Sequence, residues 1–233
     1  MISLFFITGP IIQVKGMTNW KTLLDRIDRS DHGVITQHYT TSTKLHNAHR
    51  YFEKISILIP NQKATDLMEI EVDNQGHFKR ANFTNSYLQK AGDYLGEIDA
   101  FFYTLRSCID SFLWEINLIF KLDCQKATRV IKVMNIKCND KKTNVLLQSL
   151  GEETWFKYLN DVRNYVIHRK LHDIAICIEN LQLYLPKEPW KNGYSSYSRE
   201  QEFEVITCFS NLLEKTRNFL EKGYGLVIDD LNF

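Results

Sequence analysis

The sequence lacks the motifs of several common protein classes. It has no Gly-rich phosphate loop of the Walker or dinucleotide type, so nucleotide hydrolysis and redox cofactors have no support. It has no internal repeat and no low-complexity segment. His168 and His172 stand four residues apart, as metal-binding pairs on helices do, but no third ligand or zincin-type glutamate accompanies them. We therefore expect neither a cofactor nor a metal site.

Neither the cysteine pattern nor the net charge points to a particular class of site or partner. The five cysteines, at positions 108, 124, 138, 177 and 208, are unevenly spaced and include no Cys-x-x-Cys pair. This pattern fits a reduced cytosol better than secretion, so we expect a cytoplasmic protein. Lys and Arg number 29 and Asp and Glu 28, so the net charge of +1 gives no global reason to expect an anionic partner. An anionic partner would have to bind a locally basic part of the surface.

The N-terminal stretch Ile2–Val14 is apolar but shorter than the about 20 residues that a membrane-spanning helix needs. It contains Pro10 and has no basic leader, so we expect two short strands and no membrane association. Either Met1 or Met17 fits as the start of translation. A chain of 233 residues with 44% hydrophobic content can bury a sizeable core, and we expect one domain.

Hydrophobic spacing predicts a mainly helical chain. Apolar residues recur at helical intervals from Asp93 to Leu122, the most regular of the predicted helices. Further helices are predicted over 41–52, 125–137, 152–170 and 198–222. The helix over 152–170 is expected to start with a capping box formed by Ser149 and Glu152. Runs typical of β-strands occupy 55–59, 68–72 and 77–83, the last two arranged as a hairpin, while 174–185 fits either a strand or a short helix.

These elements predict an up-and-down helical bundle with a small N-terminal addition of strands and a hairpin. We expect residues 93–233 to form the bundle and residues 1–92 to pack on it. One face of the 93–122 helix, opposite its core stripe, gathers six residues that we call the polar–aromatic face: Asp99, Tyr103, Arg106, Asp110, Trp114 and Asn117. A purely solvated face rarely carries Tyr and Trp, so this face is expected to contact a partner.

The predicted 152–170 helix carries the segment that points most directly to chemistry, Arg163-Asn164-Tyr165-Val166-Ile167-His168. Arg163 and His168 are about 140° apart around the helix and about 7.5 Å apart along it, with Asn164 between them. All three are expected on the side turned away from the core. An imidazole moves protons near neutral pH, and a guanidinium stabilises charge on phosphoryl oxygens. The three residues together suit phosphate chemistry.

Arg163-Asn164-x-x-x-His168 resembles the R-x(4–6)-H motif of the HEPN superfamily (higher eukaryotes and prokaryotes nucleotide-binding domains), including the polar residue that often follows the arginine. The resemblance covers roughly residues 93–222. It implies a metal-independent endoribonuclease in which His168 assists attack of a ribose 2′-OH on the adjacent phosphate while Arg163 stabilises the transition state. It also implies an acidic residue on an earlier helix that supports the arginine, with Asp110 as the candidate and Glu115 as the runner-up.

The resemblance has consequences for partners as well. In many members of the superfamily the motifs of two protomers meet across an interface, so a homodimer that cleaves RNA is implied. By analogy the protein would be a microbial toxin or antiviral defence effector, which leaves room for an antitoxin or regulatory protein. The alternative is a non-catalytic helical module that binds a nucleotide or a protein through the polar–aromatic face. In that case Arg163 is simply a cation near a helix end, where the helix dipole favours it.

Two further segments allow two interpretations each. Residues 121–142 carry seven basic residues against two acidic ones, which fits phosphate contact or, more commonly, a solvated helix face. The aromatic residues between Trp190 and Tyr197 could stack on unpaired bases or pin a loop onto the bundle.

Overall fold

A computed structural model of the protein describes residues 17–28, 30–58, 68–83, 85–168, 175–176, 183–186 and 202–231. Within these ranges the chain is mainly helical, as hydrophobic spacing predicts. The helices are α1 (Thr18–Arg26), α2 (His32–Leu58), α4 (Asn85–Ile119), α5 (Ala127–Lys137), α6 (Lys142–Leu150), α7 (Thr154–His168) and α8 (Val205–Asp230). The strands expected within Ile2–Val14 and the aromatic loop between Trp190 and Tyr197 lie outside the described residues.

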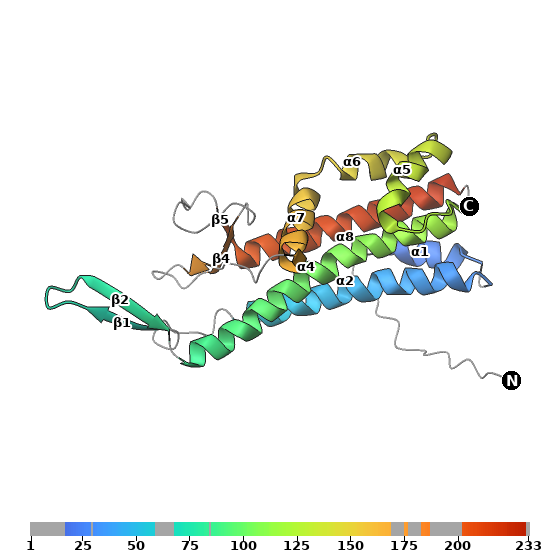
Figure 1. Cartoon of the computed structure of the whole chain (residues 1–233). Helices are drawn as coiled ribbons and strands as arrows, with labels where there is room; N and C mark the ends of the chain where they lie inside the picture. Colours follow the sequence, from blue (N-terminus) through green and yellow to red (C-terminus); the bar gives the residue numbers. More distant parts are fainter. Residues whose placement is uncertain are drawn as a thin grey trace.

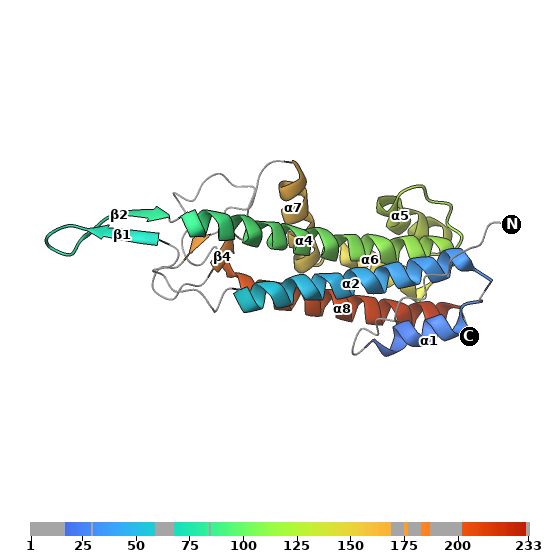
Figure 2. The same ribbon diagram turned by 90° about the horizontal axis from the view of Figure 1, so that it is seen from below.

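Three long helices, α2, α4 and α8, lie side by side along the molecule (Figures 1 and 2). α4 and α8 run in the same direction, because Phe101 stacks on Phe209 with ring centroids 3.9 Å apart and, further along both helices, Phe112 meets Phe219 edge-on at 5.7 Å. α2 runs against them, since its early residue Gln37 binds the carbonyl of Ser111 and its late residue Lys54 binds Glu97. The helices form a bundle, but not in the simple up-and-down order expected, because α5, α6 and α7 return the chain before α8 begins.

The expected division after residue 92 is not a structural boundary. α4 is continuous through residues 92 and 93, and both α1 and α2 contribute to the same hydrophobic core as α4 and α8, for example through Trp20 and Leu45. The run 55–59, predicted as a strand, instead ends α2 at Leu58. In helical geometry Ile55 is fully buried while Ile57 stays 64% exposed, so the helix buries only one of these two β-branched side chains.

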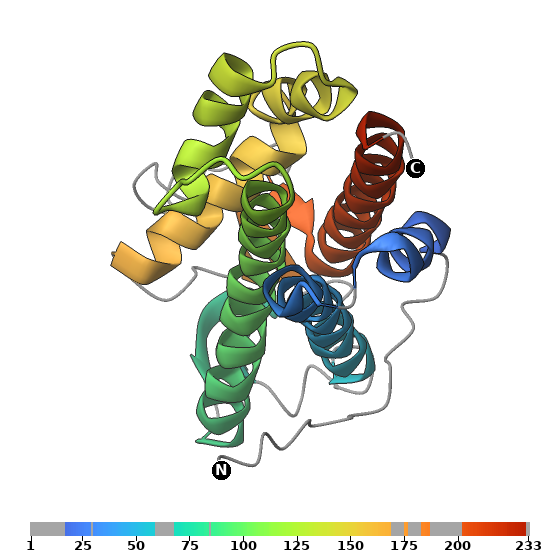
Figure 3. The same ribbon diagram turned by 90° about the vertical axis from the view of Figure 1, so that its right-hand side faces the viewer.

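The short helices α5, α6 and α7 lie on one side of α4, whereas α1 lies on the other side of the bundle against α8 (Figure 3). α6 was not predicted. Ser149, expected to cap the following helix, is part of α6, where its hydroxyl donates to the carbonyl of Leu146 at 2.8 Å. The predicted capping box is therefore wrong, and α7 begins at Thr154.

β1 (Met68–Val72) pairs antiparallel with β2 (Phe78–Phe83), and the pair lies beyond the N-terminal end of α4 (Figures 1 and 2). In the connecting turn, Asp73 Oδ1 accepts the backbone N–H groups of Gln75 and His77, both at 2.8 Å. Gly76 has a φ of +82°, a left-handed conformation that a residue with a Cβ rarely adopts. The hydrogen bonds of Asp73 and the left-handed Gly76 thus stabilise the turn that joins the two strands.

A second small sheet precedes α8. Its antiparallel strands are β3 (Ala175–Ile176), β4 (Leu183–Pro186) and β5 (Glu202–Glu204), in the order β3-β4-β5. The last helix starts at Val205, later than the predicted residue 198, because the Glu204 carboxylate caps it by accepting the N–H groups of Ile206 and Thr207. None of the described helices combines the length and the apolar composition that crossing a membrane requires.

Candidate functional site

The last two turns of α7 carry the segment singled out in the sequence. α7 packs through Phe156, Leu159 and Val162, which are buried, while Arg163 is partly exposed and Asn164 is exposed. Arg163 Nη1 donates to Asn164 Oδ1 at 3.1 Å, so the guanidinium and the amide are already in contact. His168 is the final residue of α7, and its side chain lies outside the described part of the structure.

Arg106 of α4 joins α4 to α7. Its Nε donates to Asn160 Oδ1, and its guanidinium lies over the ring of Phe156, 5.1 Å from the centroid. One helical turn along α4, Asp110 Oδ1 approaches Arg106 Nη1 at 2.5 Å, as a close ion pair without a well-directed hydrogen bond. Asn160 precedes Arg163 by less than one turn. Arg106 therefore holds the segment of α7 from which Arg163 and Asn164 project.

Asp110, the acidic residue implied for Arg163, is thus engaged by Arg106. Among the described residues no ion pair joins Asp110 to Arg163. The runner-up, Glu115, is fully buried and bound to His38 and Tyr224, away from the α7 segment. The structure brings Arg163 and Asn164 together, whereas Asp110 is connected to their helix only indirectly, through Arg106 and Asn160.

The polar–aromatic face of α4 meets parts of its own chain. Arg106 contacts α7 and pairs with Asp110 on its own helix. Asn117 is buried, with its Oδ1 accepting the N–H of Cys124 at 2.8 Å and its Nδ2 donating to the Cys124 carbonyl at 3.3 Å. Tyr103 remains 56% exposed. The expectation that this face contacts another molecule is therefore corrected for its buried part, which is covered by α7 and by the connection to α5.

Asp99 belongs to the same face, about two turns before Arg106. Its side chain is half-buried, and desolvation raises the pKa of Asp99 from its ordinary value of 3.8 to about 6. Burial disfavours a carboxylate because the charged form loses more hydration than the neutral acid does. Asp99 therefore changes its protonation close to neutral pH.

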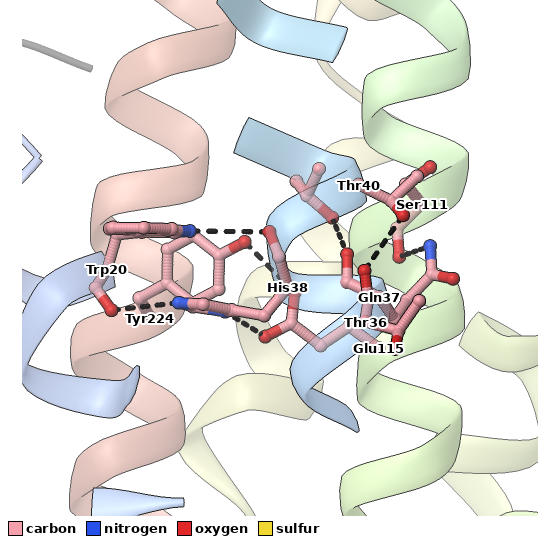
Figure 4. Close-up of polar contacts among 9 residues, drawn as sticks. Trp20, Thr36, Gln37, His38, Thr40, Ser111, Glu115 and Tyr224 are labelled. Carbon is pink, nitrogen blue, oxygen red and sulfur yellow. Dashed lines mark hydrogen bonds and ion pairs between the residues drawn. The ribbon is translucent and has the colours of Figure 1, made fainter. Parts of the chain in front are cut away.

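A buried polar network, missed in the sequence, joins four helices around Glu115 (Figure 4). Glu115 Oε1 lies 2.5 Å from His38 Nδ1, and Glu115 Oε2 accepts a hydrogen bond from the Tyr224 hydroxyl at 3.0 Å. His38 Nε2 donates to the Trp20 carbonyl at 3.0 Å, and its ring stacks on the Trp20 indole with centroids 4.6 Å apart. Because a carbonyl only accepts, Nε2 is the donor in its contact with Trp20, and Nδ1 faces the Glu115 carboxylate.

This network lies inside the bundle core and is closed to a substrate. His38, Glu115 and Tyr224 are each 0% exposed. Burial, with Glu115 alongside, raises the pKa of Tyr224 well above its ordinary value of 10, so the phenol remains a hydrogen-bond donor. The signal for it in the sequence was Glu115 itself, a charged residue inside the apolar run of α4. Its partners lie too far away in the sequence to be inferred.

No metal centre is formed in the described ranges, where no group of three or more His, Cys, Asp or Glu side chains is arranged to hold an ion. Comparison of the chain with known proteins finds no matching family model, no matching curated sequence and no matching solved structure. The function proposed below therefore rests on the residues of the chain itself.

Proposed function

We propose that the protein is a metal-independent endoribonuclease of the HEPN type, with Arg163, Asn164 and His168 on α7 as its site. The observation that carries the proposal is the contact between Arg163 and Asn164, both accessible, at the end of a helix whose other side is packed on the bundle. A rigid support is what a catalytic group needs to keep its geometry. The cluster offers a charged donor and an amide side by side.

In this reaction His168 takes the proton from a ribose 2′-OH, and the 2′-oxygen attacks the adjacent phosphorus. The bond from phosphorus to the 5′-oxygen breaks, and that oxygen takes a proton from water. The products are a 2′,3′-cyclic phosphate and a 5′-hydroxyl end. Arg163 stabilises the charge on the phosphoryl oxygens, and Asn164 orients the guanidinium through its 3.1 Å hydrogen bond.

Arg106 and Asp110 act here as positioning residues. Arg106 ties α7 to α4 through Asn160 and Phe156, and Asp110 balances the charge of Arg106. This differs from the direct support of Arg163 by an acidic residue that the resemblance implies. The precision of the site then depends on the contact between α4 and α7.

We further propose that the active form is a cytoplasmic homodimer in which two α7 segments face one RNA, as in a toxin or defence effector under control of another protein. The competing function, a non-catalytic binding module, was based on the polar–aromatic face. Two residues of that face, Arg106 and Asn117, are already engaged by α7 and by the α4–α5 connection, which leaves less of it to bind a partner.

The test is cleavage of total RNA by the purified protein, with and without a chelator, followed by analysis of the ends. Arg163→Ala and His168→Ala should each reduce the rate by about 100-fold or more, while the chelator has no effect. Exposed residues of the same types on other helices serve as controls, His49→Ala on α2 and Arg217→Ala on α8. Cleavage that survives in His168→Ala would contradict the proposal.

A further inference from the structure

Six of the seven basic residues between 121 and 142 fall into two groups with different surroundings. Lys137, Lys141 and Lys142 each contact another residue of the bundle. Lys137 Nζ donates to the Leu122 carbonyl at 3.1 Å, Lys141 Nζ donates to the Asp230 carbonyl at 3.2 Å, and Lys142 Nζ lies 3.0 Å from Asp229 Oδ2. These contacts tie the α4–α5 connection to α5 and the start of α6 to the end of α8.

The second group lies at the start of α5 and is free of such contacts. Lys126, Arg129 and Lys132 are exposed, and none has an acidic partner among the described residues. We call these three residues the α5 basic surface. Arg129 and Lys132 are three positions apart on one side of α5, and Lys126 precedes the helix as its N-cap, while Val130 and Met134 on another side are buried. Positive charge is therefore left uncompensated on this side of α5.

The chemistry of the α5 basic surface favours a phosphate-bearing strand over a membrane. A helix that adsorbs to a lipid surface needs a broad apolar face, and the apolar face of α5 is already buried in the core. Ile136 is the large apolar side chain of α5 that stays exposed, at 70%, which is too little to anchor the helix in lipid. Closely spaced cations without acidic neighbours suit the backbone phosphates of a nucleic acid.

The positions of α5 and α7 in the fold relate the α5 basic surface to the proposed site on α7. Both helices lie on the same side of α4 (Figure 3). α4 touches α7 through Arg106 and the connection to α5 through Asn117, eleven residues or about 16 Å further along the helix. The two places at which α4 meets α7 and the connection to α5 are therefore separated along α4 by the length of a few nucleotides.

We propose that the α5 basic surface binds the phosphate backbone of single-stranded RNA and guides it toward Arg163 and Asn164 on α7. This inference rests on the proposed function for the identity of the strand. Contacts to phosphates carry no sequence information, so the surface adds affinity for RNA without selecting a sequence.

The experiment measures binding of a fluorescent single-stranded RNA oligonucleotide to full-length protein carrying His168→Ala, so that cleavage does not interfere. Adding Arg129→Ala and Lys132→Ala should weaken binding about 10-fold at low salt and reduce the slope of log K against log salt by about 1.4, the share of two phosphate contacts. The matched control is Lys215→Ala with Lys222→Ala, two exposed lysines seven residues apart on α8, which should change neither quantity. Circular dichroism verifies that each variant is folded.

The outcomes separate this inference from the proposed function. If the wild type cleaves RNA but Arg129→Ala with Lys132→Ala keeps the affinity and the salt slope, the inference is overturned and the ribonuclease stands. If the double variant loses RNA binding while the wild type cleaves no RNA, the RNA-binding role of the α5 basic surface is confirmed and the proposed ribonuclease activity is contradicted. Binding to vesicles containing phosphatidylserine that needs the same two residues, with no binding to RNA, would also overturn the inference.

Discussion

His38 Nδ1 lies 2.5 Å from Glu115 Oε1, where neither side chain has any exposed surface. The pair joins α2 to α4, and Tyr224 and Trp20 extend it to α8 and α1. A buried pair of this kind contributes little when intact, because desolvation offsets the attraction. Its importance appears when one partner is removed, since the other is then left buried without its counterpart.

Glu115→Ala should therefore lower the free energy of unfolding by about 3–5 kcal/mol, measured by urea denaturation. Glu115→Gln should cost less, because an amide keeps an oxygen for the Tyr224 hydroxyl and the original shape. The control is Glu214→Gln on the exposed surface of α8, expected to change stability by less than about 0.5 kcal/mol. Equal effects of Glu115→Ala and Glu214→Gln would refute a stabilising role for the network.

Gly223 of α8 should not tolerate a methyl group. A Cβ at this position would lie 2.5 Å from Cζ of Phe112, a buried ring that also packs against Phe219 and Tyr224. Gly223→Ala is expected to destabilise the protein by about 1–3 kcal/mol through overpacking. Gly96→Ala in α4 is the control: a Cβ there meets no atom within 4 Å, so helix propensity should raise stability by about 0.5–1 kcal/mol. Stabilisation by Gly223→Ala would show that α4 and α8 are not this close.

Asp110 should couple energetically to Arg106 and not to Arg163. Because Asp110 and Arg106 form the close pair, a double-mutant cycle with alanine at both positions should give a coupling of about 0.5–3 kcal/mol in unfolding stability. The cycle of Asp110→Ala with Arg163→Ala should be additive within about 0.5 kcal/mol. Coupling of Asp110 to Arg163, together with additivity between Asp110 and Arg106, would instead identify Asp110 as the direct partner of Arg163.

The cysteines should differ in reactivity. Burial raises the pKa of both Cys108 and Cys208 to about 12, whereas Cys124 and Cys138 are partly exposed. Since the thiolate is the reactive form, a disulfide reagent at pH 8 should modify two thiols quickly and two only after unfolding. The measurement uses Cys177→Ser, because residue 177 lies outside the described ranges. If all four thiols are modified at the same rate, the burial of Cys108 and Cys208 is contradicted.

Asp99 should make stability depend on pH in a defined direction. Its pKa is raised to about 6 in the folded protein, so between pH 4 and 6 the folded state holds a proton that the unfolded chain has released. Stability attributable to Asp99 is therefore present at low pH and lost as pH rises through 6. In urea titrations, the stability of Asp99→Asn relative to the wild type should increase from pH 4 to pH 7. A difference that does not vary with pH would rule out the raised pKa.

Local periodicity was sufficient for the most regular helices. The repeat of Ile98, Phe102 and Leu105 predicts α4, because a helix needs only its own sequence to align one apolar stripe. The strand predicted over 55–59 is wrong, since a short apolar run of five positions fits a buried strand and a helix end equally well. The predicted start of α7 is also wrong, because the capping pattern at Ser149 occurs inside α6, where the Leu146 carbonyl accepts the hydrogen bond of the hydroxyl.

By itself, the sequence determined the helical character of the chain and the grouping of Arg163 and Asn164 near the end of one helix, because both depend on residues a few positions apart. Only the tertiary structure decided which charges meet. Asp110 pairs with Arg106, and Glu115 with His38, 77 residues away. These pairings follow from how α2, α4, α7 and α8 pack, and packing depends on the whole buried surface of the chain, which no local pattern contains.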